Sequence, residues 1–201
     1  IDGKTHNLYS YLNDGKTVYL DFFATWCPPC WSHHQSGSLE DLYQSYGPNG
    51  TDEIMVIMIE GDTRTNVNCI SGSSGCNNNT QGDWTAGTNF PIADNASVRQ
   101  LYQVGYYPTI YGICPDKIVT ELGQRSSSQY YDWHQNNCAL TVNLVEKKDV
   151  LCHGNMTGSV EVVADGGTGN YSFTWSNGMA GEKIQGVSAD FYYVTLSDGP
   201  T

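Results

Sequence analysis

The chain has 201 residues, with 21 Asp and Glu against 9 Lys and Arg, which gives a formal net charge of −12. So acidic a protein is a poor partner for nucleic acid, because few cations could displace the counterions of phosphate. The longest wholly apolar run, residues 54–59, is far shorter than the roughly 20 residues of a membrane-spanning helix, so no membrane span is expected.

Seven cysteines in this lysine-poor chain indicate disulfides. Disulfides persist in oxidising compartments, so the composition predicts an extracytoplasmic protein that is periplasmic, secreted or bound to the cell surface. A cytosolic protein with incidental thiols is the alternative, since seven is an odd number.

The first part of the chain alternates between strand and helix patterns. Residues 17–24 form a nearly continuous apolar run, as in a strand covered on both faces. Apolar residues recur at helical spacing over residues 39–46, and residues 54–59 form a second apolar strand. Strand, helix and strand in this order predict a parallel βαβ unit and the α/β fold class.

A long polar segment follows at residues 61–89, rich in Gly, Ser, Asn and Thr. Loops of this length are uncommon in compact domains and are usually functional or tied down. We therefore interpret residues 61–89 as an insertion and predict a disulfide between Cys69 and Cys76 that closes a short loop within it.

Regular elements are predicted again after the insertion. Residues 96–104 read as a helix whose Leu101 faces inward with its apolar neighbours. Residues 109–113 and 117–120 read as the two strands of a hairpin, and residues 126–137 as a helix with serine caps.

Two further cysteines flank these elements, Cys114 on the hairpin turn and Cys138 at the end of the last helix. A structural disulfide between them is the first expectation, although sequence alone does not fix which cysteines pair.

After Cys138 the pattern changes to short β-rich runs separated by Gly, Asn and Asp turns. The runs are residues 142–145, 159–163, 171–175 and 192–196. This pattern predicts a small antiparallel β-sandwich. The expected domains are therefore residues 1–138 and residues 139–201.

The segment Cys27-Pro28-Pro29-Cys30 contains two cysteines whose spacing predicts thiol–disulfide chemistry. Cys27 is expected at a helix N-terminus, where unpaired N–H groups and the helix dipole favour a thiolate. Cys30, about one turn further, could then attack a mixed disulfide formed at Cys27. The two prolines suit the first turn of a helix, where a missing N–H costs little.

A zinc site is the alternative for this segment, since Cys27, Cys30 and His34 could present three ligands. The chain has no second Cys-x-x-Cys to complete a tetrahedral site, so no metal and no organic cofactor are expected. His33 and His34 are then predicted as solvated surface residues of the helix.

The run Leu-Asp-Phe-Phe-Ala-Thr-Trp-Cys-Pro-Pro-Cys at residues 20–30 resembles the redox segment of thioredoxins and of TlpA-like periplasmic thioredoxins. The likeness continues in order and spacing through residues 89–92, 106–109 and 114–119, and covers about residues 5–138. The resemblance implies a thioredoxin fold, with a central mixed sheet flanked by helices.

The resemblance also implies roles for individual residues. Cys27 matches the attacking thiol, Cys30 the resolving thiol and Pro108 the cis-proline that packs against the dithiol. Asp21 matches a buried acid that takes the proton of the resolving thiol. A structural acid bonded to nearby backbone is the alternative for Asp21.

The same resemblance implies a substrate-binding surface formed by Trp26, Tyr107 and Thr109, with Tyr107 offering its backbone to an extended peptide. A plain packing role is the alternative for Trp26. The chain departs from thioredoxins because its strand at residues 54–59 lacks the lysine that neighbours the buried acid. An acid that TlpA-like proteins often carry after this strand corresponds to Asp62, with Glu60 as a competitor.

The C-terminal segment resembles a SprB-type repeat, a β-sandwich module of long surface proteins in gliding Bacteroidetes. The residues that carry this resemblance are 152–154, 158–160, 166–178 and 194–199. The implied role is spacing or adhesion. These repeats usually end Asp-x-x-Gly-Cys, whereas this chain reads Asp198-Gly199-Pro200, so Cys152 has no assigned partner and the native chain is expected to continue past Thr201.

The favoured function is an extracytoplasmic thiol-disulfide oxidoreductase that acts on protein or peptide disulfides and is served by a dithiol partner protein. The alternative is a non-catalytic surface or adhesion protein with a static Cys27–Cys30 disulfide. A peroxide-reducing enzyme is less favoured, because such sites usually have Thr-x-x-Cys, whereas Thr25 stands two residues before Cys27.

Overall fold

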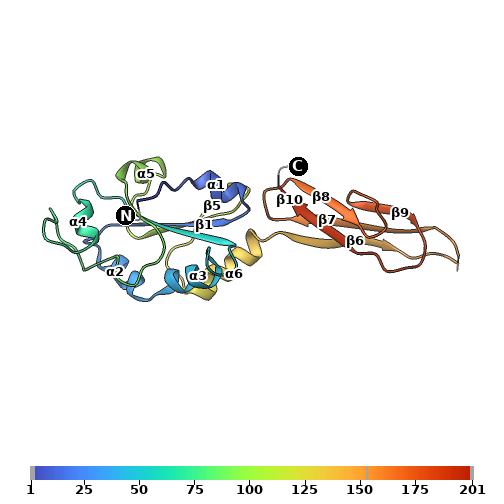
Figure 1. Ribbon diagram of the computed structural model, residues 1–201, viewed down its shortest axis with the longest axis horizontal. Helices are drawn as coiled ribbons and strands as arrows, with labels where there is room; N and C mark the ends of the chain where they lie inside the picture. Colours follow the sequence, from blue (N-terminus) through green and yellow to red (C-terminus); the bar gives the residue numbers. More distant parts are fainter. Residues whose placement is uncertain (1–2, 153, 200–201) are drawn as a thin grey trace.

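The computed structural model describes residues 3–152 and 154–199. His153, Pro200 and Thr201, which enter the predictions for the C-terminal segment, lie outside the described residues. Two parts lie end to end along the long axis, a helix-flanked sheet followed by smaller sheets (Figure 1). In the described part of the chain, no helix is both long and apolar enough to cross a membrane.

The first part is an α/β layer structure with five strands in the order β3-β2-β1-β4-β5. The strands are β1 Thr17–Phe23, β2 Ile54–Glu60, β3 Ile92–Asp94, β4 Thr109–Ile113 and β5 Val119–Glu121. The helices are α1 Leu8–Asn13, α2 Pro28–Gln35, α3 Ser38–Tyr46, α4 Val67–Ile70, α5 Ala96–Leu101 and α6 Ser127–Asn137. Strands β1, β2 and β3 run parallel while β4 and β5 pair antiparallel, which confirms the predicted mixed sheet of a thioredoxin fold.

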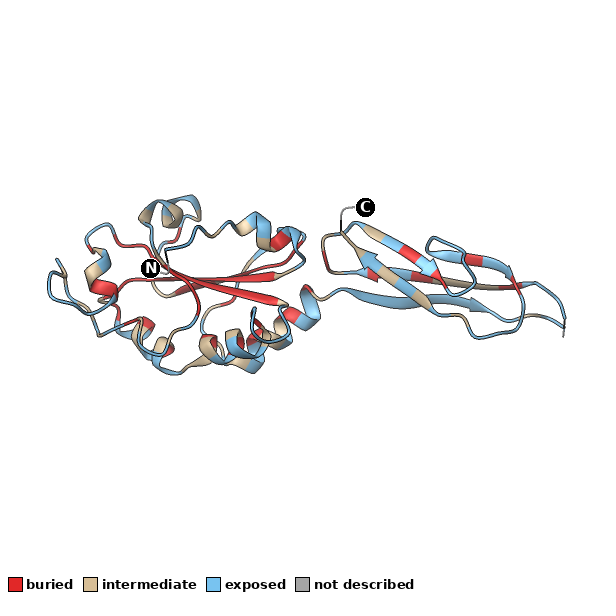
Figure 2. Cartoon of the chain, viewed as in Figure 1, coloured by how far each residue is buried: buried red, intermediate tan, exposed pale blue. Residues whose placement is uncertain are grey.

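Strands β1 and β2 form the centre of the core, and every residue in both is buried (Figure 2). Alternate residues feed two apolar clusters, with Tyr19 and Phe23 in one and Leu20 and Phe22 in the other. A strand buried on both faces reads as a continuous apolar run, which is why both strands are evident in the sequence. Their burial fixes the end of β1, from which Cys27 follows.

Three details of this part differ from the predictions. Helix α5 ends at Leu101, which is 80% exposed, so its predicted inward orientation is wrong. Val98 and Tyr102, the other two residues predicted to face inward, do pack against the core. Strand β5 begins at Val119 because the preceding turn runs on through Lys117, whose φ is 73°.

The insertion at residues 61–89 packs on the main core of the first part, since Ile70 and Trp84 belong to the same apolar cluster as Phe23. It contains α4 and a disulfide between Cys69 and Cys76, with a Cα–Cα distance of 4.5 Å. Its Trp84 is fully buried, with its ring 4.5 Å from that of Phe23. The segment is therefore tied to the end of β1.

A second disulfide joins Cys114, after β4, to Cys138 at the end of α6, with a Cα–Cα distance of 5.0 Å. Both cysteines are buried. Their separation of 24 residues makes the closed loop much longer than that of the Cys69–Cys76 pair, which are 7 residues apart.

We expect the double variant Cys114→Ala/Cys138→Ala to lower the free energy of unfolding by about 3 kcal/mol, because the unfolded chain regains the entropy of that loop. Urea unfolding monitored by far-UV circular dichroism checks this loss. Replacing Cys69 and Cys76 together is the matched control and should cost less, since its loop is shorter. An equal or larger loss in the control contradicts the prediction.

The second part consists of two antiparallel sheets of order β6-β7-β9 and β10-β8. Its strands are β6 Thr141–Lys148, β7 Gly158–Asp165, β8 Tyr171–Trp175, β9 Lys183–Val187 and β10 Val194–Asp198. Phe173 and Trp175 from one sheet pack with Val162 and Ile184 from the other, which confirms a small antiparallel β module. Strand β9 was not predicted, because Lys183, Gln185 and Gly186 give it little β character.

The two parts meet directly after α6. The N–H of Gly167 donates to the carbonyl of Cys138 at 3.0 Å. Gly166 has a φ of 78°, and a Cβ there would lie 2.1 Å from the carbonyl oxygen of Ala139. Only glycine fits so close an approach, so the β7–β8 turn packs on the last residues of the first part.

Candidate active site

The buried end of β1 places Cys27 at the start of α2. Cys27 is the N-cap of this helix, and its Sγ accepts the N–H of Cys30 at 3.2 Å. Its own N–H donates to the carbonyl of Ala24 at 2.9 Å. The sulfur thus occupies the position where a side-chain acceptor normally caps the helix and where the dipole favours negative charge.

Cys27 and Cys30 form a disulfide with a Cα–Cα distance of 5.3 Å, and each residue is only 3% exposed. Pro28 and Pro29 fill the first helical turn and are exposed. On reduction, the N–H that bonds Cys27 Sγ would stabilise its thiolate and lower its pKa. The pair can therefore act as a dithiol–disulfide couple.

Asp21 lies on β1 and is 3% exposed. Burial raises the pKa of its carboxyl to about 7, and no charged neighbour offsets that rise. Among the described residues, its Oδ1 has no hydrogen-bond partner. The carboxyl borders a cavity of about 230 Å³ that is also lined by His33 and Met58. This volume has room for several waters, so Asp21 has the pKa and the surroundings of a proton acceptor.

His33 is buried, at 8% exposed, which contradicts its predicted place on the solvated surface. Its Nε2 lies 3.2 Å from the hydroxyl of Tyr130, which donates to the carbonyl of Gly123 at 2.9 Å. Burial lowers the pKa of His33 to about 4, so the ring is neutral at pH 7. The contact with α6 explains the burial, and no local pattern in the sequence signals it. His34 is half-buried, with its ring 5.2 Å from that of Trp84.

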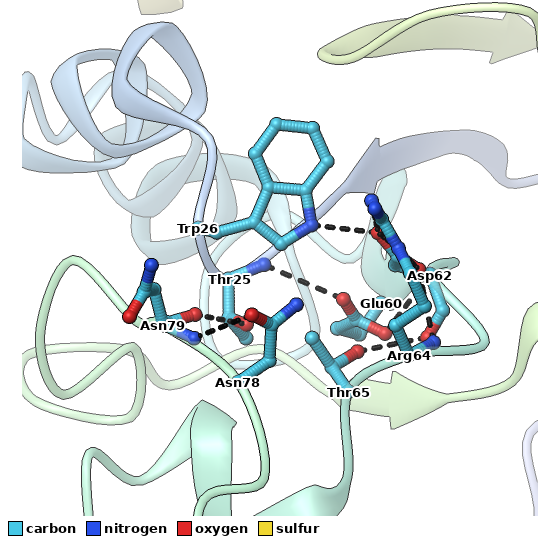
Figure 3. Close-up of polar contacts among 8 residues, drawn as sticks. All are labelled: Thr25, Trp26, Glu60, Asp62, Arg64, Thr65, Asn78 and Asn79. Atoms are coloured by element: carbon cyan, nitrogen blue, oxygen red, sulfur yellow. Dashed lines mark hydrogen bonds and ion pairs between the residues drawn. The ribbon is translucent and has the colours of Figure 1, made fainter.

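Glu60 and Asp62 take different positions beside Trp26 (Figure 3). Glu60 is fully buried, accepts the N–H groups of Thr25 at 3.4 Å and Asp62 at 3.1 Å, and burial raises its pKa to about 7. Asp62 accepts the indole N–H of Trp26 at 2.6 Å and pairs with Arg64, which holds the pKa of Asp62 well below its usual range. Asp62 therefore orients Trp26, while Glu60 joins the end of β2 to the turn before Cys27.

The peptide bond between Tyr107 and Pro108 is cis and directly precedes β4. The Tyr107 ring stands 6.3 Å from that of Trp26, edge to face. Thr109 is 1% exposed, and its hydroxyl donates to the carbonyl of Tyr106 at 2.8 Å. The Thr109 side chain therefore supports this turn and does not face a substrate, which corrects its predicted role.

A cleft of about 550 Å³ opens directly beside the disulfide. Cys27, Trp26 and Tyr107 line it together, whereas Asp21 borders the separate cavity at the C-terminal end of α2. The start of the insertion contributes Asp62 and Arg64 to the cleft wall. Arg99 also lines the cleft, and sequence reasoning missed both arginines because no motif surrounds them.

The later residues of the insertion contact the turn before Cys27 and the helix α2 that follows it. The N–H of Gln81 donates to the carbonyl of Thr25 at 2.9 Å, and its side chain donates to the carbonyl of Trp26 at 3.0 Å. The Trp84 ring stacks edge to face on Trp31 of α2 at 4.9 Å. The insertion thus holds the turn that carries Cys27.

Comparison with known families gives two matches along the chain. Residues 2–98 match the Redoxin family, and residues 144–180 match the SprB repeat. The first match contains Asp21, Cys27 and Cys30, and the second contains strands β7 and β8.

Among individual proteins, the thiol-disulfide oxidoreductase ResA of Oceanobacillus iheyensis is 32% identical over 113 residues, which are 55% of this chain and 50% of that protein. ResA of Geobacillus thermodenitrificans is 29% identical over 113 residues, 55% of each chain. The chain thus spans about half the length of these relatives. The solved structure of an exposed lipoprotein thioredoxin from Streptococcus pneumoniae is 25% identical, with a TM-score of 0.44, and the match covers 67% of this chain and 93% of that one.

Proposed function

Since residues 2–98 belong to a redoxin domain of the thioredoxin superfamily, we propose that the protein is an extracytoplasmic thiol-disulfide oxidoreductase. The observation that carries this proposal is the placement of Cys27 Sγ at the N-cap of α2, bonded by the N–H of Cys30 and bordering an open cleft. This is the environment that turns a cysteine into a nucleophile at neutral pH.

The proposed reaction is thiol–disulfide exchange with a protein or peptide. In the reducing direction, the Cys27 thiolate attacks one sulfur of the substrate disulfide, and the other substrate sulfur leaves as a thiolate. Cys30 then loses its proton and attacks Cys27 Sγ, which releases the second substrate thiol and forms the Cys27–Cys30 disulfide. Two electrons pass to the substrate, and a dithiol partner protein must restore the reduced pair.

In this scheme Asp21 accepts the proton of Cys30, with water as the relay between the two side chains. Trp26, Tyr107 and the cis-bonded Pro108 form the docking surface, with Tyr107 offering its backbone to an extended substrate segment. An acid whose pKa lies near 7 can take and return a proton at neutral pH, which suits this role.

An extracytoplasmic site of action is supported by the two disulfides outside the cleft, Cys69–Cys76 and Cys114–Cys138. We further propose two domains, residues 1–138 with the insertion at 61–89, and residues 139–201 as a SprB-like module. The second domain would space or attach the first at a bacterial surface, since its match is to a repeat family.

A redox assay distinguishes the enzyme from a non-catalytic surface protein with a static Cys27–Cys30 disulfide. We expect the reduced full chain to cleave the disulfides of insulin, and the Cys27–Cys30 couple to titrate against glutathione between roughly −270 and −120 mV. A potential below about −300 mV together with no insulin reduction would support the static disulfide instead.

A further inference from the structure

Arg99 stands in the cleft beside Cys27 without a carboxylate partner. It lies on α5 and is half-buried, and its Nε donates to the carbonyl of Val104 at 3.1 Å. Its guanidinium lies over the ring of Tyr107, 5.2 Å from the centroid. Within residues 3–152 and 154–199, no carboxylate oxygen comes within the 4.0 Å of an ion pair with Arg99. Partly buried charges are usually paired. Among the described residues, the Arg99 guanidinium is oriented by Val104 and Tyr107 but has no ion-pair partner.

The rest of the cleft leaves this charge uncompensated. The lining of the cleft holds two arginines and one carboxylate. That carboxylate, Asp62, pairs with Arg64 at 2.6 Å, which leaves the charge of Arg99 without a counter-charge in the lining. Glu60 lies beneath the wall, fully buried, and its raised pKa leaves it partly protonated near neutral pH. The cleft is therefore net positive on a protein whose formal charge is −12. A local field opposite in sign to the whole chain favours a negatively charged ligand.

The position of Arg99 relates it to a docked substrate. Its guanidinium stacks on Tyr107, the residue before the cis-bonded Pro108, and Cys27 lines the same cleft. A chain segment whose disulfide reaches Cys27 would therefore enter the same cleft that Arg99 lines. Arginine offers its planar fork to a carboxylate in two parallel hydrogen bonds, which is the strongest pairing open to it.

We propose that this cleft selects client segments with an aspartate or glutamate next to the disulfide cysteine, and that Arg99 binds that carboxylate. The inference rests on the proposed function, because it assumes that the disulfide of the client must reach the Sγ atom of Cys27. Arg64 is held by Asp62 and therefore does not compete with Arg99 for the same carboxylate.

The test uses the oxidised full chain and three cysteine-free peptides in which serine replaces the client cysteine, flanked by aspartate, asparagine or lysine. Binding is followed by the change in intrinsic fluorescence of the chain's five tryptophans, of which Trp26 lines the cleft. At low salt we expect the aspartate peptide to bind roughly fivefold more tightly than the asparagine peptide, and the difference to shrink with added salt. The lysine peptide should bind more weakly than either.

Arg99→Gln should bring the aspartate peptide to the affinity of the asparagine peptide, whereas Arg99→Lys should keep part of the preference. Lys148→Gln, which removes the same charge from exposed strand β6, is the matched control and should change nothing. Equal affinities for the aspartate and asparagine peptides, or a preference that survives Arg99→Gln, would overturn the inference.

Reduction of a disulfide-linked asparagine peptide by the reduced chain separates this inference from the proposed function. A chain that reduces this peptide but binds acidic and neutral peptides equally is an oxidoreductase without the selectivity, so the inference fails alone. A chain with an Arg99-dependent preference that reduces no disulfide keeps the acidic-peptide site, and the proposed function fails.

Discussion

Replacing Cys27 with serine should abolish the reduction of insulin and of peptide disulfides, with a loss of at least about a thousandfold. A serine hydroxyl at the same N-cap position is not ionised at neutral pH, so the bond to the N–H of Cys30 cannot produce a nucleophile. The fold should persist, because serine is itself a favourable N-cap residue. The second-order rate constant for insulin reduction by the pre-reduced variant measures the loss.

Cys30→Ser provides the complementary experiment. Attack by Cys27 still occurs, but no second thiol resolves the product, so the variant should accumulate a mixed disulfide with its client. Mass spectrometry of the trapped adduct should locate the bond at Cys27. Cys152 carries no disulfide and is exposed, so Cys152→Ser is the control for adventitious capture and should leave both results unchanged. Trapping that depends on Cys152 would contradict the assignment of Cys27.

Replacing Asp21 with asparagine should stabilise the oxidised protein, and increasingly so as the pH rises. The folded-state pKa of Asp21 is about 7 against an ordinary value of 3.8. Between these values the unfolded carboxyl is ionised while the folded one keeps its proton, so the wild-type chain loses stability as the pH rises through this window. The full penalty, reached above pH 7, is up to about 4 kcal/mol.

The measurement is urea unfolding of both proteins at pH 5 and pH 8 with disulfides intact. The stability advantage of Asp21→Asn should grow by about 3 kcal/mol between the two pH values. Glu60 also has a raised pKa, but it is present in both proteins and cancels from the difference. Asp132→Asn, at an exposed position on α6, should show no such growth. An Asp21→Asn advantage of the same size at both pH values would contradict a raised pKa.

Much of the fold was predictable because its elements have local causes. Strands β1 and β2 are buried on both faces, so their apolar runs show in the sequence. The start of α6 is fixed by a capping box between Ser126 and Gln129. The serine cap was predicted from the sequence, but the bond to the side chain of Gln129 was not. Cys27 at a helix start also follows locally, since a strand, two cysteines and two prolines specify it.

The remainder depends on contacts between residues far apart in the chain. His33 is buried only because Tyr130 of α6 reaches it, and the polar sequence of α2 marks no buried face. Thr109 is adjacent to the cis-bonded proline but uses its hydroxyl within the turn. Arg99 enters the cleft because the fold brings α5 beside Cys27, and a lone arginine carries no sequence signal of that placement.

The Cys114–Cys138 disulfide also has a mechanical consequence for a protein attached through its C-terminal module. A pull on β6 reaches Cys138 first, and from there it passes through the covalent bridge to Cys114 at the end of β4. Strand β5 and helix α6 lie inside the bridged loop and therefore bear no tension while the bridge is intact. The load is then expected to pass to the central sheet, where β4 is hydrogen-bonded to β1. The contact of Tyr130 on α6 with His33 lies outside that loaded path.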